Sequence, residues 1–111
     1  MDVQNVFRAL SDPTRRDILM MLAEREMSIG EVSERFEITR AAVKKHLIIL
    51  REGDLISVHS RGREKVNRLE PDALRGAADW IGYFSGFWDG RLAALQEAVT
   101  KEMEERKDDD D

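Results

Sequence analysis

Four cationic side chains stand on one short segment, residues 39–52, which reads TRAAVKKHLIILRE. They belong to Arg40, Lys44, Lys45 and Arg51, and each can pair with an anion such as a phosphate. An arginine or a lysine can also donate to N7 and O6 of guanine. Apolar residues recur between the cations at helical spacing, so the segment is expected to be a helix with one basic face.

The charge of this region is opposite to that of the chain as a whole. The 111 residues have a formal net charge of −5. Residues 39–68 hold eight Lys and Arg against three Asp and Glu, which is +5, whereas the remaining residues hold ten against twenty, which is −10. One part of the surface is therefore suited to meet an anion. The alternative is a solvated basic face with no partner.

Local capping signals predict the helices that must position these cations. Apolar spacing predicts a first helix over residues 3–10, and Asp12 followed by Pro13 begins a second over about 13–24. Ser28 and Glu31 have capping-box spacing and begin a third helix that ends at about Phe36. Thr39 can cap a fourth over about 40–52. Two short helices joined by such a turn are typical of a helix-turn-helix.

Alternating residues after the basic helix predict a two-stranded wing. Residues 55–59 and 65–69 alternate with period two, and Gly62 lies in the intervening turn over residues 60–64. Arg61, Arg63 and Lys65 lie at or beside this turn, where they would meet a DNA backbone or minor groove. The alternative is a hairpin tip that only confers solubility.

A last helical segment from Pro71 to about residue 106 carries an apolar band. Its members are Trp80, Phe84, Phe87, Trp88, Leu92, Leu95 and Val99. Small residues recur at every fourth position, namely Ala78, Gly82, Gly86, Gly90, Ala94 and Ala98. Glycine is costly inside a helix, so this spacing favours close approach of another helix. The alternative is that one glycine breaks the segment into two helices.

The motifs named so far resemble those of the ArsR-type winged helix-turn-helix repressors. NVFRALSDPTRRDIL at residues 5–19, AVKKHL at 42–47, LREGDLI at 50–56 and Gly62-Arg63 follow the family's pattern in register over roughly residues 5–72. Residues 80, 87–88 and 91–95 resemble the tail of a subgroup with a Trp/Phe-rich last helix. The resemblance implies a mainly α fold with a small β-hairpin.

Family members are homodimers that pair through their first and last helices, and the resemblance implies the same here. The residues expected in that interface are Val3, Val6, Phe7, Leu10, Trp80, Phe84, Phe87, Trp88, Leu92 and Leu95. The aromatic cluster could instead hold a small molecule. One domain is expected over residues 1–106, with a dimerisation helix over about 71–106 and an acidic disordered tail over 107–111.

Within the family, the recognition helix would be residues 40–52 and the wing about 56–69. Arg40, Ala41 and Lys44 occupy the first turns, which reach base edges in the major groove, and Ala41 can contact a thymine methyl. The side chains suited to phosphates are those of Thr39, Lys45 and Arg51. Lys44 stands where the family usually has serine, which adds a cation at the bases. Asp54 stands where the family has glycine, so the helix could end one residue earlier or later.

Metal, cofactor and catalytic chemistry are not expected. The sequence has no cysteine and two histidines. Family metal sensors place cysteines on the third helix or Asp/His ligands on the last helix, but here residues 27–36 hold no cysteine and no histidine follows His59. His46 falls on the inward side of its helix, and His59 has no nearby ligand partner. No nucleophile motif or phosphate-binding glycine loop is present, so an enzyme is not expected.

The sequence therefore predicts a cytoplasmic, homodimeric repressor that binds double-stranded DNA at an inverted-repeat operator. No signal peptide or membrane span is expected. An effector, if one exists, would be an unidentified small molecule or protein. The alternative is a winged-helix protein-interaction module without sequence-specific DNA binding.

Overall fold

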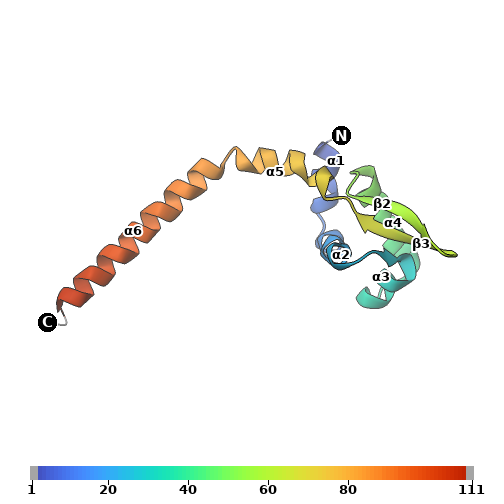
Figure 1. Cartoon of the computed structure of the whole chain (residues 1–111), viewed down its shortest axis with the longest axis horizontal. Helices are drawn as coiled ribbons and strands as arrows, with labels where there is room; N and C mark the ends of the chain where they lie inside the picture. Colours follow the sequence, from blue (N-terminus) through green and yellow to red (C-terminus); the bar gives the residue numbers. More distant parts are fainter. Residues whose placement is uncertain (1–2, 110–111) are drawn as a thin grey trace. The chain divides into compact units, whose positions relative to one another are not determined.

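A computed structural model describes residues 3–109, without the side chains of residues 92, 93 and 106–109. The chain divides into two compact units, Met1–Ala77 and Ala78–Asp111. The first unit begins with α1 (Val3–Leu10), α2 (Pro13–Glu24), β1 (Met27–Ser28), α3 (Ile29–Phe36) and α4 (Arg40–Glu52) (Figure 1). It continues with β2 (Ile56–Arg61), β3 (Glu64–Leu69) and the 3-10 turn η1 (Pro71–Leu74). The mainly helical fold with a small sheet is confirmed.

The predicted caps begin the helices as expected. The Asp12 carboxylate accepts from the Arg15 backbone N–H at 3.0 Å and begins α2. Ser28 and Glu31 form the reciprocal capping box of α3, and the Thr39 hydroxyl oxygen accepts from the Ala42 N–H at 3.1 Å to begin α4. Each cap satisfies a backbone donor that has no partner inside its helix.

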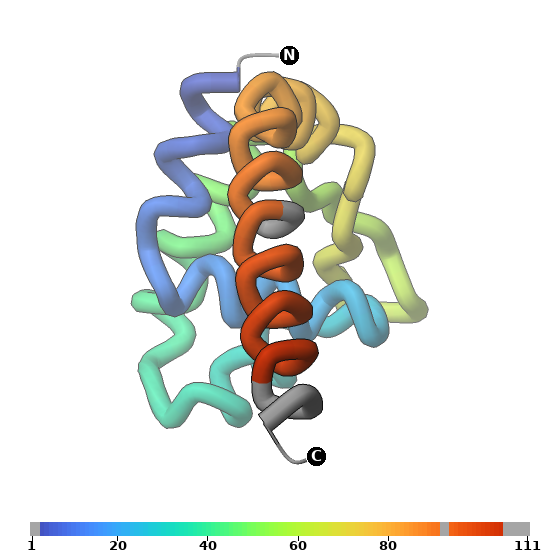
Figure 2. Tube along the Cα trace, turned by 90° about the vertical axis from the view of Figure 1, so that its left-hand side faces the viewer, coloured from blue at the N-terminus to red at the C-terminus, as the bar shows by residue number. Residues whose placement is uncertain are grey.

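The core of the first unit lies where α1, α2, α3 and α4 meet. α1 packs against α4, and α3 packs against α4 across the helix-turn-helix. Figure 2 shows α1 along one side of this unit. Side chains from all of these helices and from the entry to β2 are fully buried, among them Val6, Ile18, Val32, Val43, Leu50 and Leu55. Buried apolar positions on α4 thus orient its opposite, basic face outward.

The sheet differs from the predicted two-stranded wing, because a third strand joins it. The order is β1-β3-β2, and Met27 and Ser28 of β1 pair antiparallel with Asn67 and Val66 of β3. The Asn67 side chain reinforces this pairing by donating to the Met27 carbonyl at 3.2 Å. A strand of two residues is too short to show an alternating pattern, so local sequence could not indicate it.

The turn of the wing is shorter than the predicted span of residues 60–64. Arg61 pairs with Glu64, which leaves only Gly62 and Arg63 in the turn. Gly62 has φ +63°, and glycine at the first central position is typical of a type II′ hairpin turn. This short turn fixes the register of β2 on β3.

At the end of α4, Gly53 and Asp54 divide between them two tasks that one glycine could perform: allowing close approach of α1 and adopting a positive φ. Gly53 follows the last helical residue, and a Cβ there would lie 3.1 Å from the Asn5 carbonyl oxygen. Asp54 takes the left-handed conformation, with φ 58°. Gly53 therefore allows α1 to approach, while Asp54 makes the turn into β2.

The segment after Pro71 is interrupted, as the glycine-break alternative allowed. α5 (Arg75–Gly82) ends at Gly82, and α6 (Ser85–Asp109) begins after Tyr83 and Phe84 (Figure 1). α6 extends beyond residue 106, where the helix was expected to end, and Asp110 and Asp111 lie outside the described residues. Among the described helices, none is both long and apolar enough to cross a membrane.

Candidate nucleic-acid interface

The basic face of α4 points away from the core. Val43 and Leu50 are fully buried and Leu47 is 6% exposed, so this side of the helix is fixed against the rest of the unit. Arg40, Ala41, Lys44, Lys45, Ile48 and Arg51 are exposed. The exposed residues 40, 41, 44, 48 and 51 recur at three- and four-residue intervals and share one face.

The N-terminal end of α4 is held in a defined turn. Glu37 takes the left-handed conformation with φ 54° after α3, and the Ser33 hydroxyl donates to the Ile38 carbonyl at 2.6 Å. Thr39 then caps α4 and keeps its hydroxyl hydrogen for another acceptor. The Arg40 guanidinium lies over Gly30 of α3, where a Cβ would be 2.9 Å from its Nη2. The first turn of α4 is thus capped by Thr39 and exposed.

A groove of about 320 Å³ lies between α4 and the wing. Three predicted cations line it: Lys44 and Arg51 from α4 and Lys65 from β3. Its other lining residues are Ile29, Leu47, Ile48, Val58 and Asn67. The structure therefore brings Lys65 of β3 beside Lys44 and Arg51 of α4, around a partly apolar floor.

The wing presents Arg61 and Lys65 on opposite faces. Lys65 pairs with Ser60, and Arg61 pairs with Glu64, so Lys65 and Arg61 are on different sides of the ladder. Arg63 lies in the exposed turn. The structure thus separates Arg61 from the groove that Lys65 lines.

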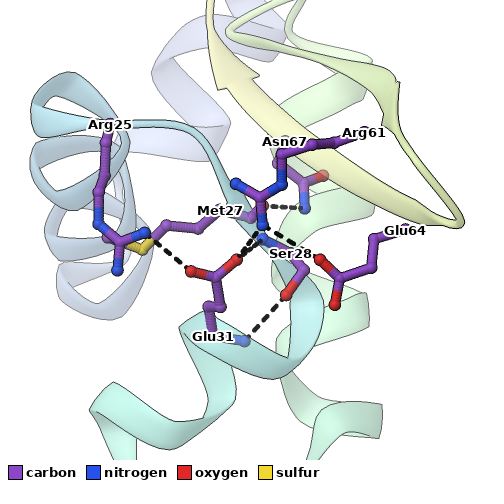
Figure 3. A network of polar contacts seen from close by, with 7 residues as sticks. All are labelled: Arg25, Met27, Ser28, Glu31, Arg61, Glu64 and Asn67. Carbon is purple, nitrogen blue, oxygen red and sulfur yellow. Dashed lines mark hydrogen bonds and ion pairs between the residues drawn. The ribbon is translucent and has the colours of Figure 1, made fainter.

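Arg61 is bound by two carboxylates. Its Nη2 donates to Glu31 Oε1 at 2.7 Å and to Glu64 Oε2 at 3.1 Å (Figure 3). These hydrogen bonds raise the pKa of Arg61 above its ordinary value. The Ser28 backbone N–H, Arg61 and Arg25 all donate to Glu31, and together they lower the pKa of that carboxyl to about 2. Glu31 is consequently ionised throughout the neutral range.

A second polar group joins the motif before α2 to the inner side of α4. Arg15 Nη1 lies 3.5 Å from His46 Nδ1, and Asp12 Oδ2 lies 3.9 Å from the same nitrogen. The backbone hydrogen bond from Arg15 is the main cause that lowers the pKa of Asp12. His46 is thus a packed, hydrogen-bonded residue. No cluster of potential metal ligands occurs in the described part of the chain.

The predicted interface residues of α1 differ in their accessibility. Val6 is fully buried in the core of its own unit, and Phe7 and Leu10 pack against that core. Val3 is 39% exposed. Of these four residues, only Val3 is therefore broadly available to a partner. Val6 is wrong as a direct contact, because its side chain is buried in the core of its own unit.

The second unit carries an exposed aromatic surface. Trp80, Phe87, Trp88 and Leu95 are each more than half exposed. Trp80 and Phe84 stack edge to face with ring centroids 5.1 Å apart. A groove of about 560 Å³ is lined by Trp80, Ile81, Phe84, Phe87, Trp88 and Arg91. The side chain of Leu92, another predicted interface residue, lies outside the described residues.

Sequence reasoning missed some residues of both surfaces. Helical spacing places Ile48 on the α4 face of Lys44 and Arg51, but Ile48 is not among the predicted contact residues, although it lines the groove. Val58 was predicted only as a strand residue. The spacing of Ser28 and Glu31 predicts a cap, but no local signal connects Glu31 with Arg61, thirty residues away in sequence.

The fold and the sequence match one group of known proteins. The family model described as "Bacterial regulatory protein, arsR family" matches residues 12–58. The transcriptional repressor SdpR of Bacillus subtilis is 36% identical over 90 residues, which cover 81% of this chain and 100% of SdpR. The regulator KmtR of Mycobacterium tuberculosis is 38% identical over 66% of this chain and 56% of KmtR.

Solved structures agree with this match. The ArsR-like transcriptional regulator from Rhodococcus sp. RHA1 has a TM-score of 0.72 and 32% identity, covering 89% of this chain and 91% of that protein. The DNA-binding domain of Mb0332 from Mycobacterium bovis has a TM-score of 0.61 and 21% identity, covering 75% and 80% of the two chains. The latter, described as a homodimeric winged helix-turn-helix, shares the fold.

Proposed function

Because the chain belongs to the ArsR family of bacterial regulatory proteins, whose members regulate transcription by binding DNA, we propose that it is a homodimeric repressor of an inverted-repeat operator. The main structural support for the proposal is that Lys44, Arg51 and Lys65 line one groove between α4 and the wing. α4 would enter the major groove, and repression would follow from occlusion of a promoter. The protein would act in the cytoplasm.

The first turns of α4 supply the contacts to bases. Arg40, Ala41 and Lys44 are exposed there, and a cation at residue 44 can donate to guanine N7 and O6. Thr39 keeps a hydroxyl hydrogen for a phosphate. The capped, uncovered N-terminus of α4 adds a favourable dipole for an anion.

The contacts to phosphates come from several parts of the same surface. Lys45 and Arg51 extend from α4, and Arg63 and Lys65 extend from the wing. Among the described residues, none of these four forms an ion pair with an acidic side chain of its own chain. They are therefore free to replace the counterions of DNA.

A second copy would cover the aromatic surface of the second unit. Trp80, Phe87 and Trp88 leave a large apolar area in water, which is unusual for a protein that works alone. A twofold dimer places two recognition helices about one helical turn of DNA apart. An effector, if one exists, would be a small molecule or protein and not a metal at the family's usual sites.

The test is DNA binding by the full chain, measured by fluorescence anisotropy over a series of salt concentrations. The probes are the DNA upstream of the protein's own gene and a mixed-sequence duplex of equal length. We expect tighter binding to the upstream DNA and a steep loss of affinity with salt. Equal binding to both duplexes would favour a winged-helix interaction module.

Alanine variants of the three cations that line the groove test whether DNA binds there. Arg51→Ala and Lys65→Ala should each reduce the salt dependence, by a slope of about 0.9 for every phosphate that is no longer neutralised. Lys44→Ala, at a proposed base contact, should mainly reduce the affinity for the upstream DNA. Lys101→Ala, on the exposed surface of α6, removes the same charge outside the proposed interface and serves as the matched control. Unchanged affinity and slope in all three groove variants would contradict the assignment.

A further inference from the structure

The Glu31 carboxylate joins three elements of the first unit. Its Oε1 accepts from the Ser28 backbone N–H at 3.1 Å and from Arg61 at 2.7 Å, and its Oε2 accepts from Arg25 at 2.8 Å (Figure 3). Arg25 follows the last residue of α2, Ser28 caps α3, and Arg61 ends β2. One side chain therefore serves both as a helix cap and as an attachment point for the wing.

Arg61 differs from the other cations of the candidate interface. It faces two carboxylates, those of Glu31 and Glu64, and its side chain is 43% exposed. Lys65 lies on the opposite face of the wing, in the groove beside α4. Arg61 is therefore neutralised and turned away from the surface where Lys65 would meet DNA.

A bound phosphate would gain little from Arg61. The guanidinium would have to exchange two carboxylates for one phosphate, so few counterions would be released from the DNA. Glu31 would also keep its negative charge near the phosphate, because the N-terminal end of α3 stabilises an anion there. The low pKa of Glu31, about 2, agrees with a carboxylate that stays charged at neutral pH.

We propose that Glu31 is a positioning residue that keeps Arg61 as a strut between the wing and α3. The phosphate contacts of the wing then come from Arg63 and Lys65, and Arg61 contributes none. This inference rests on the proposed DNA-binding function and assigns a different role to one of the cations predicted to contact DNA.

The test uses the full-length protein and a fluorescein-labelled mixed-sequence duplex, because non-specific binding depends on phosphate contacts alone. The slope of log affinity against log salt is compared for the wild type, Arg61→Ala, Glu31→Gln, the double variant and Arg63→Ala. The amide introduced by E31Q can still accept from the Ser28 N–H, so this variant keeps the capping box while it removes the charge. Circular dichroism checks that each variant is folded.

The expected slopes separate the two arginines of the wing. R63A should reduce the slope by about 0.9 per protomer, which is about a 3.5-fold change in affinity over a fourfold change in salt. R61A should keep the wild-type slope. E31Q should steepen it, because Arg61 then faces one carboxylate, that of the exposed Glu64, and gains more from a phosphate. The double variant should return to the wild-type value.

A second measurement tests the strut itself. R61A and E31Q should both speed hydrogen exchange of the β2 and β3 amides, whereas R63A should leave these rates unchanged, because residue 63 lies in the turn. A slope reduction in R61A equal to that in R63A would overturn the role proposed for Glu31 and Arg61, and so would an unchanged slope in E31Q. Either result would leave the proposed DNA-binding function intact. A wild type without salt-dependent DNA binding would remove the proposed function, and this inference with it.

Discussion

Arg15 donates its Nε hydrogen to the carbonyl oxygen of Ala9 at 2.8 Å, and so closes the C-terminal end of α1 from the first turn of α2. Its Nη2 also donates to the Arg8 carbonyl at 3.0 Å, and Arg16 donates to the Leu10 carbonyl at 2.7 Å. The last carbonyls of a helix lack partners within it. The two arginines of the SDPTRR motif therefore act as caps that fix α1 against α2.

Replacing Arg15 with methionine should destabilise the first unit. The substitution keeps most of the apolar stem but leaves the Ala9 carbonyl without its donor, at a cost of about 1–3 kcal/mol, whereas the Arg8 carbonyl keeps the Ser11 N–H and hydroxyl as donors. Urea unfolding followed by circular dichroism measures this change. Arg35→Met, at an exposed position of α3, is the matched control and should change stability by less than about 0.5 kcal/mol. Equal effects in both variants would contradict the capping role.

Replacing Glu37 with glycine should stabilise the helix-turn-helix. Glu37 has φ 54°, a conformation that costs an ordinary L-residue about 1–2 kcal/mol, and the larger entropy of glycine in the unfolded chain offsets part of this gain. A net gain of about 0.5–1 kcal/mol is expected in thermal unfolding. Glu34→Gly, within α3, should instead cost about 1 kcal/mol. The same sign in both variants would refute the prediction.

The contribution of Glu31 to stability should depend on pH only in acid. Folding lowers the pKa of Glu31 from an ordinary value of 4.5 to about 2, so the ionised form is favoured in the folded state. The stabilisation is complete above pH 4.5 and is lost as the pH falls toward 2. Urea midpoints of the wild type and E31Q should therefore differ by a constant amount near neutrality and converge over this acid range. A difference that persists at pH 2 would contradict the assignment.

Replacing Gly86 with leucine should weaken dimer formation. A Cβ at Gly86 meets nothing within 4 Å in the described part of its own chain, so a side chain that leaves the backbone here starts in open space within one copy. Light scattering should show monomer or aggregate for Gly86→Leu. Gly86→Ala, which adds only one methyl group near the beginning of α6, should remain dimeric. A leucine variant that dimerises as the wild type does would rule out close packing at this glycine.

Replacing Lys44 with serine should alter the base preference of the protein. Lys44 lies in the first turns of α4 and lines the groove beside the wing. A well-placed cation at a guanine contributes about 1–3 kcal/mol of discrimination, which serine cannot supply in the same way. Selection of bound sequences from a random pool should show relaxed preference at one position of each half-site. Arg63→Ala should lower affinity for all sequences without changing the selected site.

The helices were predictable from sequence because their signals are local. Asp12, Ser28 with Glu31, and Thr39 each cap the helix that follows them within a few residues, and apolar spacing indicated the face of α4 that is buried. The first unit therefore agrees closely with the prediction. The glycines of the last helical segment also indicated the alternative of an interrupted helix, because glycine is unfavourable inside a helix.

The other features depended on interactions between distant residues. β1 exists because Met27 and Ser28 pair with β3, which no two-residue pattern can indicate. The position of Arg61 depends on the register of the hairpin, since a shift of one residue would move its side chain to the other face. Its partner Glu31 is on another element. Which cations line the groove could therefore not be decided from the basic segment alone.

The aromatic surface of the second unit also bears on how long each molecule survives. A copy that has not met its partner leaves Trp80, Phe87 and Trp88 in water, and chaperones and proteases act on exposed surface of this kind. If pairing covers these rings, newly made copies at low concentration are degraded faster than paired ones. The concentration of paired protein would then rise sharply once synthesis is faster than degradation. The rate of degradation would therefore set the rate of synthesis above which the protein accumulates.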